Sequence, residues 1–168
     1  MAAFATPEDV ATAQERDLDA ADTATVSYLL DVATDMIKDY TEQEIEATTG
    51  VVDTLRAGNG TWLLSQIPVT AVTTVTVDGD AFTDFDVDLK AGILTRTDSS
   101  WDTCDSVVVT YDSGYATIPR SIQGVCVDIA KRAFENPAGI QRDDLNTASQ
   151  WLGLTQENER ILQRYRAR

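Results

Sequence analysis

Apolar side chains recur at three- and four-residue steps in the first part of the chain, which is the spacing of an amphipathic helix. Thr6-Pro7-Glu8-Asp9 is typical of a helix start, with a capping hydroxyl, a proline in the first turn and two acids. Asp19 is placed to cap a second, longer helix. The pattern predicts helix from about residue 6 to about residue 48. The apolar stripe of the longer helix consists of Val26, Leu29, Leu30, Ala33, Ile37 and Tyr40.

Between residues 51 and 113, β-branched residues alternate with polar ones, as they do in half-buried strands. Asn59-Gly60 predicts a two-residue hairpin between strands at 51–57 and 61–65. Asp78-Gly79 predicts a turn after a strand at 69–77. Further strands are expected at 82–89, 92–96 and 106–111. We therefore expect five or six short antiparallel strands that form a small sheet or sandwich.

The last part of the chain returns to the helical pattern. Ile118-Pro119 leads into a predicted helix that Pro137 and Gly139 end, and residues 138–150 are expected to form a polar loop. Thr155 is placed to cap a final short helix. The expected class is α+β. Its helical core comprises residues 1–50 and 114–137, with an antiparallel β domain inserted at 51–113 and a basic helical tail at 138–168.

Charge is divided unevenly along this chain of net charge −15. Residues 1–50 hold twelve acids and two bases, residues 51–113 hold ten and three, and residues 114–168 hold six and eight. Most of the protein should therefore repel nucleic acid. A basic tail on an acidic body can pair with a neighbouring copy or with another acidic partner.

Few residues suggest catalysis or redox chemistry. The chain has no histidine, which removes the commonest general base and metal ligand. Cys104 and Cys126 lie far apart and are expected to be free thiols. Trp62 and Trp101 are interpreted as core residues, whereas Trp151 is a candidate anchor on a neighbouring subunit. We expect no enzyme and no cofactor.

Three aspartates, Asp84, Asp86 and Asp88, have the spacing that opens a calcium-binding EF-hand loop. The loop fails at its sixth position, where Leu89 replaces the required glycine, and at its twelfth, where Thr95 replaces glutamate. The alternation with apolar residues favours the solvent face of a strand instead. No metal site is predicted.

No apolar run approaches the roughly 18–20 residues that span a bilayer, and the first residues lack the basic and apolar regions of a signal peptide. We expect a cytosolic protein without membrane contact.

Four segments resemble the head-to-tail connector, or adaptor, proteins of long-tailed bacteriophages, in the version common in phages of actinobacteria. They are Met36-Ile37-Lys38-Asp39-Tyr40-Thr41; Leu64 to Val72 with Val75-Thr76-Val77-Asp78-Gly79; Gly92-Ile93-Leu94-Thr95-Arg96 with Trp101; and Val107 to Tyr115 with Ile118-Pro119 and Phe134-Glu135-Asn136-Pro137. The likeness spans most of the chain in the same order.

The resemblance implies a structural virion protein that is assembled in the host cytoplasm and located in the neck at the capsid vertex. It implies a homo-oligomeric ring, commonly of twelve copies, below the portal protein. Such a ring extends the DNA channel, lets genomic DNA pass without sequence-specific binding, and docks the downstream neck or tail protein. The residues expected to contact the portal or a neighbouring subunit are Trp151, Leu152, Leu154, Arg160, Leu162, Arg164, Tyr165, Arg166 and Arg168.

Two alternatives remain open at this point. One is another neck or tail-completion role, as a stopper or terminator. The other is a non-viral module whose β domain holds a ligand, which requires a concave apolar pocket within residues 51–113. The connector interpretation instead places exposed apolar surface on the helices.

Overall fold

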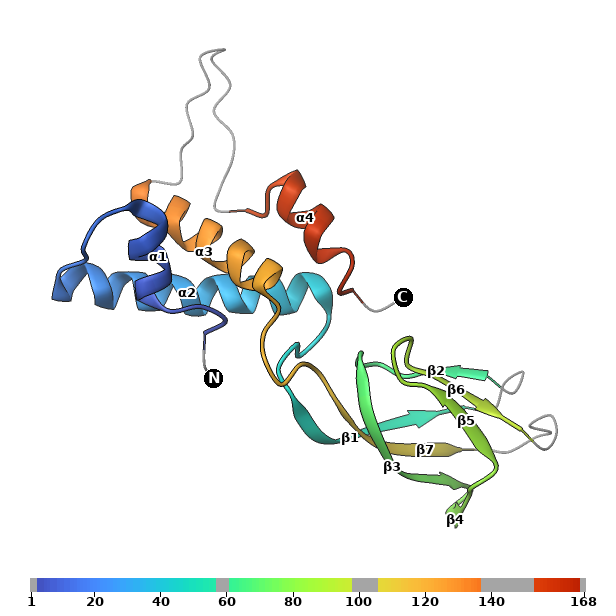
Figure 1. Cartoon of the computed structure of the whole chain (residues 1–168). Helices are drawn as coiled ribbons and strands as arrows, with labels where there is room; N and C mark the ends of the chain where they lie inside the picture. Colours follow the sequence, from blue (N-terminus) through green and yellow to red (C-terminus); the bar gives the residue numbers. More distant parts are fainter. Residues whose placement is uncertain (1–2, 57–60, 98–105, 137–152, 167–168) are drawn as a thin grey trace. The chain divides into compact units, whose positions relative to one another are not determined.

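The structure, a computed structural model, describes residues 3–56, 61–97, 106–136 and 153–166. The chain divides into two compact units (Figure 1). A helical unit comprises Met1–Glu42 and Ile118–Arg166, and a β unit comprises Gln43–Thr117. The predicted α+β class is confirmed, because helices flank a set of antiparallel strands in the sequence.

The helical unit contains four helices in its described part: α1 (Pro7–Gln14), α2 (Ala20–Thr41), α3 (Arg120–Glu135) and α4 (Gln156–Leu162). The predicted caps are confirmed. Thr6 and Asp9 form a reciprocal capping box on α1, and the Asp19 side chain accepts a hydrogen bond from the Asp22 amide at the start of α2. Thr155 caps α4 by accepting from the Asn158 amide. The starts of α1, α2 and α4 therefore follow from local side chains, whereas α3 begins after Pro119 without a side-chain cap.

The core of this unit lies between α2 and α3. Thr34 sits within it, buried, and its hydroxyl donates to the Leu30 carbonyl oxygen at 2.8 Å and accepts from the Phe4 amide at 3.1 Å. Cys126 on α3 lies 3.7 Å from the same hydroxyl. A buried polar atom with its bonds satisfied costs little and fixes the register of the two helices. Both helices bury an apolar stripe here: Val26, Leu30, Ala33 and Ile37 from α2, and Ile122, Val125, Ile129, Ala130 and Ala133 from α3.

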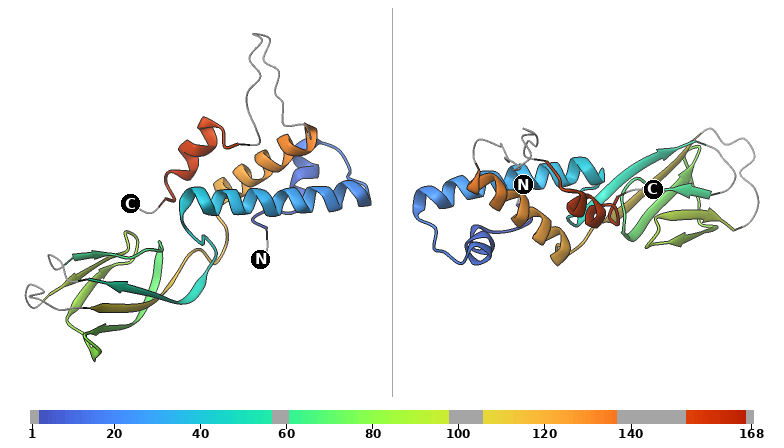
Figure 2. Two further views of the ribbon diagram at one scale, coloured as in Figure 1. Left: turned by 180° about the vertical axis from the view of Figure 1, so that it is seen from behind. Right: turned by 90° about the horizontal axis from the view of Figure 1, so that it is seen from above.

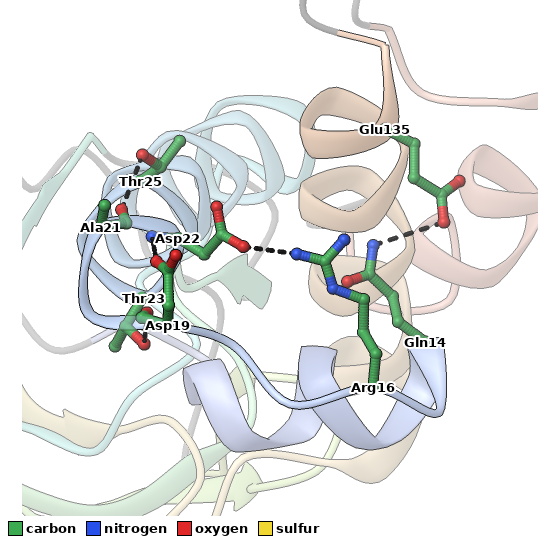
Figure 3. A network of polar contacts seen from close by, with 8 residues as sticks. All are labelled: Gln14, Arg16, Asp19, Ala21, Asp22, Thr23, Thr25 and Glu135. Carbon is green, nitrogen blue, oxygen red and sulfur yellow. Dashed lines mark hydrogen bonds and ion pairs between the residues drawn. The ribbon is translucent and has the colours of Figure 1, made fainter.

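Polar contacts fasten α1 to both long helices (Figure 3). Arg16 forms an ion pair with Asp22 at the start of α2, and its guanidinium lies 5.3 Å from the centre of the Phe134 ring on α3. The Gln14 side chain donates to Glu135 at 3.3 Å. These contacts are exposed, so they orient α1 more than they stabilise it.

The first helical region is shorter than predicted. Helix α2 ends at Thr41 rather than near residue 48, because Glu42 and Ile45 adopt left-handed backbone conformations with φ of 56° and 52°. The residues after α2 then form backbone hydrogen bonds with Tyr115, near the point where the chain leaves the β unit. The Tyr115 amide donates to the Ile45 carbonyl oxygen at 2.8 Å, and the Ala47 amide donates to the Tyr115 carbonyl oxygen at 3.1 Å. Helical periodicity does not reveal this long-range pairing.

The described part of the β unit contains seven strands in two antiparallel sheets (Figure 2). The order is β1-β7-β3-β4 in the four-stranded sheet and β2-β6-β5 in the three-stranded sheet. Their bounds are β1 (Thr48–Leu55), β2 (Thr61–Leu63), β3 (Val69–Val77), β4 (Asp80–Ala81), β5 (Phe85–Asp88), β6 (Ile93–Arg96) and β7 (Val107–Ser113). One hydrophobic cluster joins the inner faces of both sheets, so the unit is a small β-sandwich.

One turn prediction is confirmed and another is wrong. Asp78 and Gly79, with φ of 51° and 95°, connect β3 to β4 as the two central residues of a hairpin. The hairpin predicted around Asn59-Gly60 does not join its flanking strands to each other. β1 pairs with β7 and β2 pairs with β6, so these strands belong to different sheets; Asn59 and Gly60 themselves lie outside the described residues. Phe82 and Leu89 lie just outside β5.

A buried tyrosine links the two sheets. Tyr111 on β7 has no exposed surface, and its hydroxyl donates to Asp53 on β1 at 2.9 Å and accepts from the Gln66 amide at 3.0 Å. Asp53 also accepts from the Ser65 amide and hydroxyl, both at 2.7 Å. Residues 65 and 66 follow β2. The network therefore links the residues that follow β2, a strand of the three-stranded sheet, to β1 and β7 of the four-stranded sheet.

Replacing this tyrosine by phenylalanine tests the network. Tyr111→Phe removes the hydroxyl and its bonds while keeping the ring, so the free energy of unfolding of the β unit should fall by about 1–2 kcal/mol. Urea unfolding monitored by tryptophan fluorescence measures it. Tyr28→Phe is the matched control, because Tyr28 is 67% exposed and should lose almost nothing. Equal losses of unfolding free energy in the two variants would contradict the stabilising role assigned to the Tyr111 hydroxyl.

Alkaline pH tests the packing between α2 and α3. Burial raises the pKa of the Cys126 thiol from 9.0 to about 11. Below pH 9 the thiol is neutral in both the folded and the unfolded chain, and its contribution to stability is complete. Between pH 9 and 11 only the unfolded chain ionises, so the free energy of unfolding should fall with pH, by up to about 2–3 kcal/mol.

Denaturant unfolding is followed by the helical circular dichroism signal at several pH values in that range. It gives the slope of the free energy of unfolding against pH. Cys126→Ala loses stability at every pH but should also lose this part of the pH dependence. An unchanged slope in the alanine variant would show that another group causes it.

Candidate assembly surface

The C-terminal helix α4 is fastened to α3 by a polar junction. Asp128 on α3 accepts from the Asn158 side chain of α4 at 3.0 Å and from Arg132 at 3.1 Å. Arg132 also donates to the Gly153 carbonyl oxygen at 3.3 Å, before α4 begins. Asn158 is buried and Asp128 is half-exposed. The pairing places the start of α4 beside the middle of α3.

Three of the residues predicted to contact a partner face their own chain. Leu162 has no exposed surface and belongs to the core of the helical unit. The Tyr165 hydroxyl lies 2.7 Å from the hydroxyl of Ser121 at the start of α3. Arg166 donates to Glu42 at 2.8 Å. The end of the described chain is therefore held against the helical unit.

Other predicted residues remain available on the surface. Arg160 and Arg164 are exposed, and Leu154 is half-buried. Arg160 lies in α4, and Arg164 follows it four residues later, just after the helix ends. Trp151, Leu152 and Arg168 lie outside the described residues. Within the described part of the basic tail, Arg160, Arg164 and Arg166 are thus exposed, and Arg166 is paired with Glu42.

A groove of about 620 Å³ lies between α3 and α4. Gly124, in the interior of α3, forms part of its wall, and a Cβ added there would meet no other atom within 4 Å. Glycine inside a helix costs about 1 kcal/mol relative to alanine. The groove contains both charged and apolar residues: Ser121, Gly124, Val125, Asp128, Arg132, Thr155, Gln156, Glu157, Asn158 and Ile161.

The outer side of α2 has a stripe of acidic residues. Asp31, Asp35 and Asp39 are all exposed at four-residue steps, and Tyr28, 67% exposed, precedes them on the same side. Like charges at this spacing disfavour an isolated helix by about 0.2–0.5 kcal/mol per pair. The helical unit thus presents an acidic stripe on α2, while Arg160 and Arg164 are exposed on α4 and just after it.

The exposed large hydrophobic residues lie mainly in the β unit. We expected exposed apolar surface on the helices, and this was wrong for the described residues. Only Tyr28 lies on a helix, whereas Val52 (58% exposed), Leu63 (45%) and Leu89 (42%) lie on or beside strands. Alternation alone marks these positions as facing solvent, but which exposed side chains lie side by side depends on strand register.

The described residues offer little for chemistry. Within residues 3–56, 61–97, 106–136 and 153–166, no group of three or more histidine, cysteine, aspartate or glutamate side chains is placed to hold a metal. Asp86 and Asp88 are exposed on β5, and Asp88 accepts from the amides of Lys90 and Ala91 at 3.0 Å. No helix in the described part of the chain is long and apolar enough to cross a membrane.

Burial also raises the pKa of Tyr111, whose hydroxyl belongs to the network between the sheets. The raised pKa values of Tyr111 and Cys126 are therefore each explained by burial of the group within its own unit.

A family model described as head completion protein matches residues 4–136. The match runs from the segment before α1 through the β unit to the end of α3, and it stops before α4. None of the curated proteins matches the chain. The match speaks against a non-viral ligand-binding module and confirms the resemblance to phage connector and head-completion proteins. The chain belongs to the head completion protein family and is a structural protein of the bacteriophage virion.

Proposed function

We propose that this protein is the head-to-tail adaptor, and that a ring of its copies, commonly twelve in this class, lies below the portal. The ring extends the DNA channel and docks the neck or tail protein that follows. The observation that carries the proposal is the family match over residues 4–136, which includes both described units except α4 and its flanking residues. Such a role requires surfaces that meet other subunits, and it needs no reacting group.

The C-terminal segment supports a second contact beyond the ring itself. It lies outside the family match, contains the short helix α4, and presents Arg160 and Arg164 to solvent. We propose that these arginines meet an acidic surface of the portal or of the neighbouring copy, while Leu162 and Asn158 keep α4 seated on its own chain. Opposite charges across an interface mainly set its orientation and its rate of formation.

The acidic body suits a channel through which DNA slides. The stripe of Asp31, Asp35 and Asp39 does not neutralise phosphates, so DNA that passes such a wall gains no counterion-release free energy and does not adhere. We propose that acidic residues of this kind line the lumen. A density map of the neck in which basic side chains line the lumen would contradict this part of the proposal.

Removing the protein from the phage tests the function directly. A phage that lacks it should produce heads filled with DNA and free tails that remain separate, and the intact gene supplied in the host should restore joined particles. Electron microscopy of the lysates measures the fraction of joined particles. Electron microscopy of labelled virions then locates the protein. A location elsewhere in the tail would favour a stopper or terminator role and overturn the adaptor proposal.

Charge reversal tests the arginine surface. Arg160→Glu with Arg164→Glu should reduce joined particles by about tenfold or more, because like charges would then face each other across the contact. Arg56→Glu with Arg120→Glu makes the same change in net charge at two other exposed sites and serves as the control. If both double variants reduce joining equally, net charge rather than this surface is responsible.

A further inference from the structure

The outer face of the four-stranded sheet contains a continuous area without charge. Strand register places Val52 of β1 beside Thr110 of β7, and Thr110 beside Thr74 of β3. The next row across the sheet consists of Thr54, Val108, Thr76 and Ala81. The residues that alternate with these rows pack into the shared core, so the two rows point away from it. We call these seven residues the β1-β7-β3 face.

The three-stranded sheet has a smaller area of uncharged residues on its own outer side, which Asp86 and Asp88 of β5 border. Thr61 pairs with Thr95, and Leu63 pairs with Ile93, while Trp62 and Leu94 between them face the core. We call Thr61, Leu63, Ile93 and Thr95 the β2-β6 face. Because the inner sides of both sheets share one core, the two faces lie on opposite sides of the sandwich. Each face includes one strongly exposed hydrophobic residue, Val52 or Leu63.

These neutral areas are unusual for so acidic a unit. Residues 43–117 hold twelve acidic and three basic side chains. The described strands hold five acids. Asp53 accepts hydrogen bonds in the Tyr111 network, Asp80 lies on the edge strand β4, and Asp112 lies near the end of β7. Asp86 and Asp88 lie on the edge strand β5, where they pair with Thr95 and Ile93. Two copies that approach through an acidic surface repel each other. The β1-β7-β3 face has no carboxylate in its two rows, so it can meet the β2-β6 face, which Asp86 and Asp88 border, without placing carboxylates opposite each other.

Two different faces on opposite sides of one unit are what a ring needs. A ring uses heterologous contacts, in which one surface of each copy meets a different surface of the next. We propose that the β1-β7-β3 face of one copy packs against the β2-β6 face of the neighbouring copy, so that the sandwiches stack side by side around the ring. The occupant of each face is thus a second copy of this chain. This inference rests on the ring proposed above.

Cysteine cross-linking in assembled necks tests the contact. Val52→Cys and Leu63→Cys are introduced together in a background with Cys104→Ser, and Cys126 remains because it is fully buried. Necks purified from virions are treated with a short bis-maleimide. The double variant should give a ladder of covalent oligomers on denaturing gels. Each single variant should stay monomeric, and virions grown with both single variants should give dimers only.

The outcomes separate this inference from the proposed function. A Val52→Cys variant that dimerises alone would show that like faces meet, and the head-to-tail pairing would be wrong. If necks contain the protein as a ring but the double variant gives no covalent oligomers, the proposed contact between the two faces is wrong, while the adaptor function still holds. A protein located elsewhere in the virion would overturn both.

A charge pair gives an independent readout. Thr110→Glu alone and Thr95→Glu alone should each reduce incorporation into necks by about tenfold or more, because each places a carboxylate inside a neutral contact. Thr110→Lys combined with Thr95→Glu should restore it, since the new charges are opposite across the proposed contact. Thr12→Glu, on the exposed side of α1, is the control and should have no effect. Loss of incorporation without rescue, in variants that unfold normally, would contradict the pairing.

Discussion

The pairing of residues 45–47 with Tyr115 is the constraint on which the architecture depends. It joins the point where the chain enters the β unit to the point where it leaves, through a bridge between Glu46 and Tyr115. Gly114 makes the close approach possible: its φ is 91°, and a Cβ there would lie 2.2 Å from the Glu46 carbonyl oxygen. Because entry and exit meet, a long insertion separates α2 from α3 in the sequence without separating their apolar faces.

Features set by neighbours in the sequence could be predicted, and features set by distant residues could not. The caps at Thr6, Asp19 and Thr155 follow from side chains that reach only three residues ahead, and the Asp78-Gly79 turn follows from its own backbone requirement. The end of α2 at Thr41 depends instead on a partner far along the chain, and so does the pairing of β1 with β7. Local propensity is a weak guide to such pairings.

In the candidate assembly surface, too, local features could be predicted from the sequence, whereas features that depend on distant residues could not. The sequence identified the basic C-terminal segment, because charge is visible without a fold, but it could not show that Leu162 and Arg166 face their own chain. It also marked Val52, Thr110 and Thr74 only as positions on the wet side of three separate strands. Register places them in one row, and only then does the absence of charge become a property of a surface.

Net charge and neutral faces together suggest how assembly is controlled. A charge of −15 keeps dilute copies apart, and repulsion between their acidic surfaces grows as the ionic strength falls. A contact made of threonine, valine and leucine is short-ranged and small, so by itself it does not overcome this repulsion. If the sandwiches stack as proposed, the copies join only where something else raises their local concentration, as the proposed binding to adjacent portal subunits would. Under the proposed function, the same balance would keep an acidic protein from forming rings before it reaches the capsid vertex.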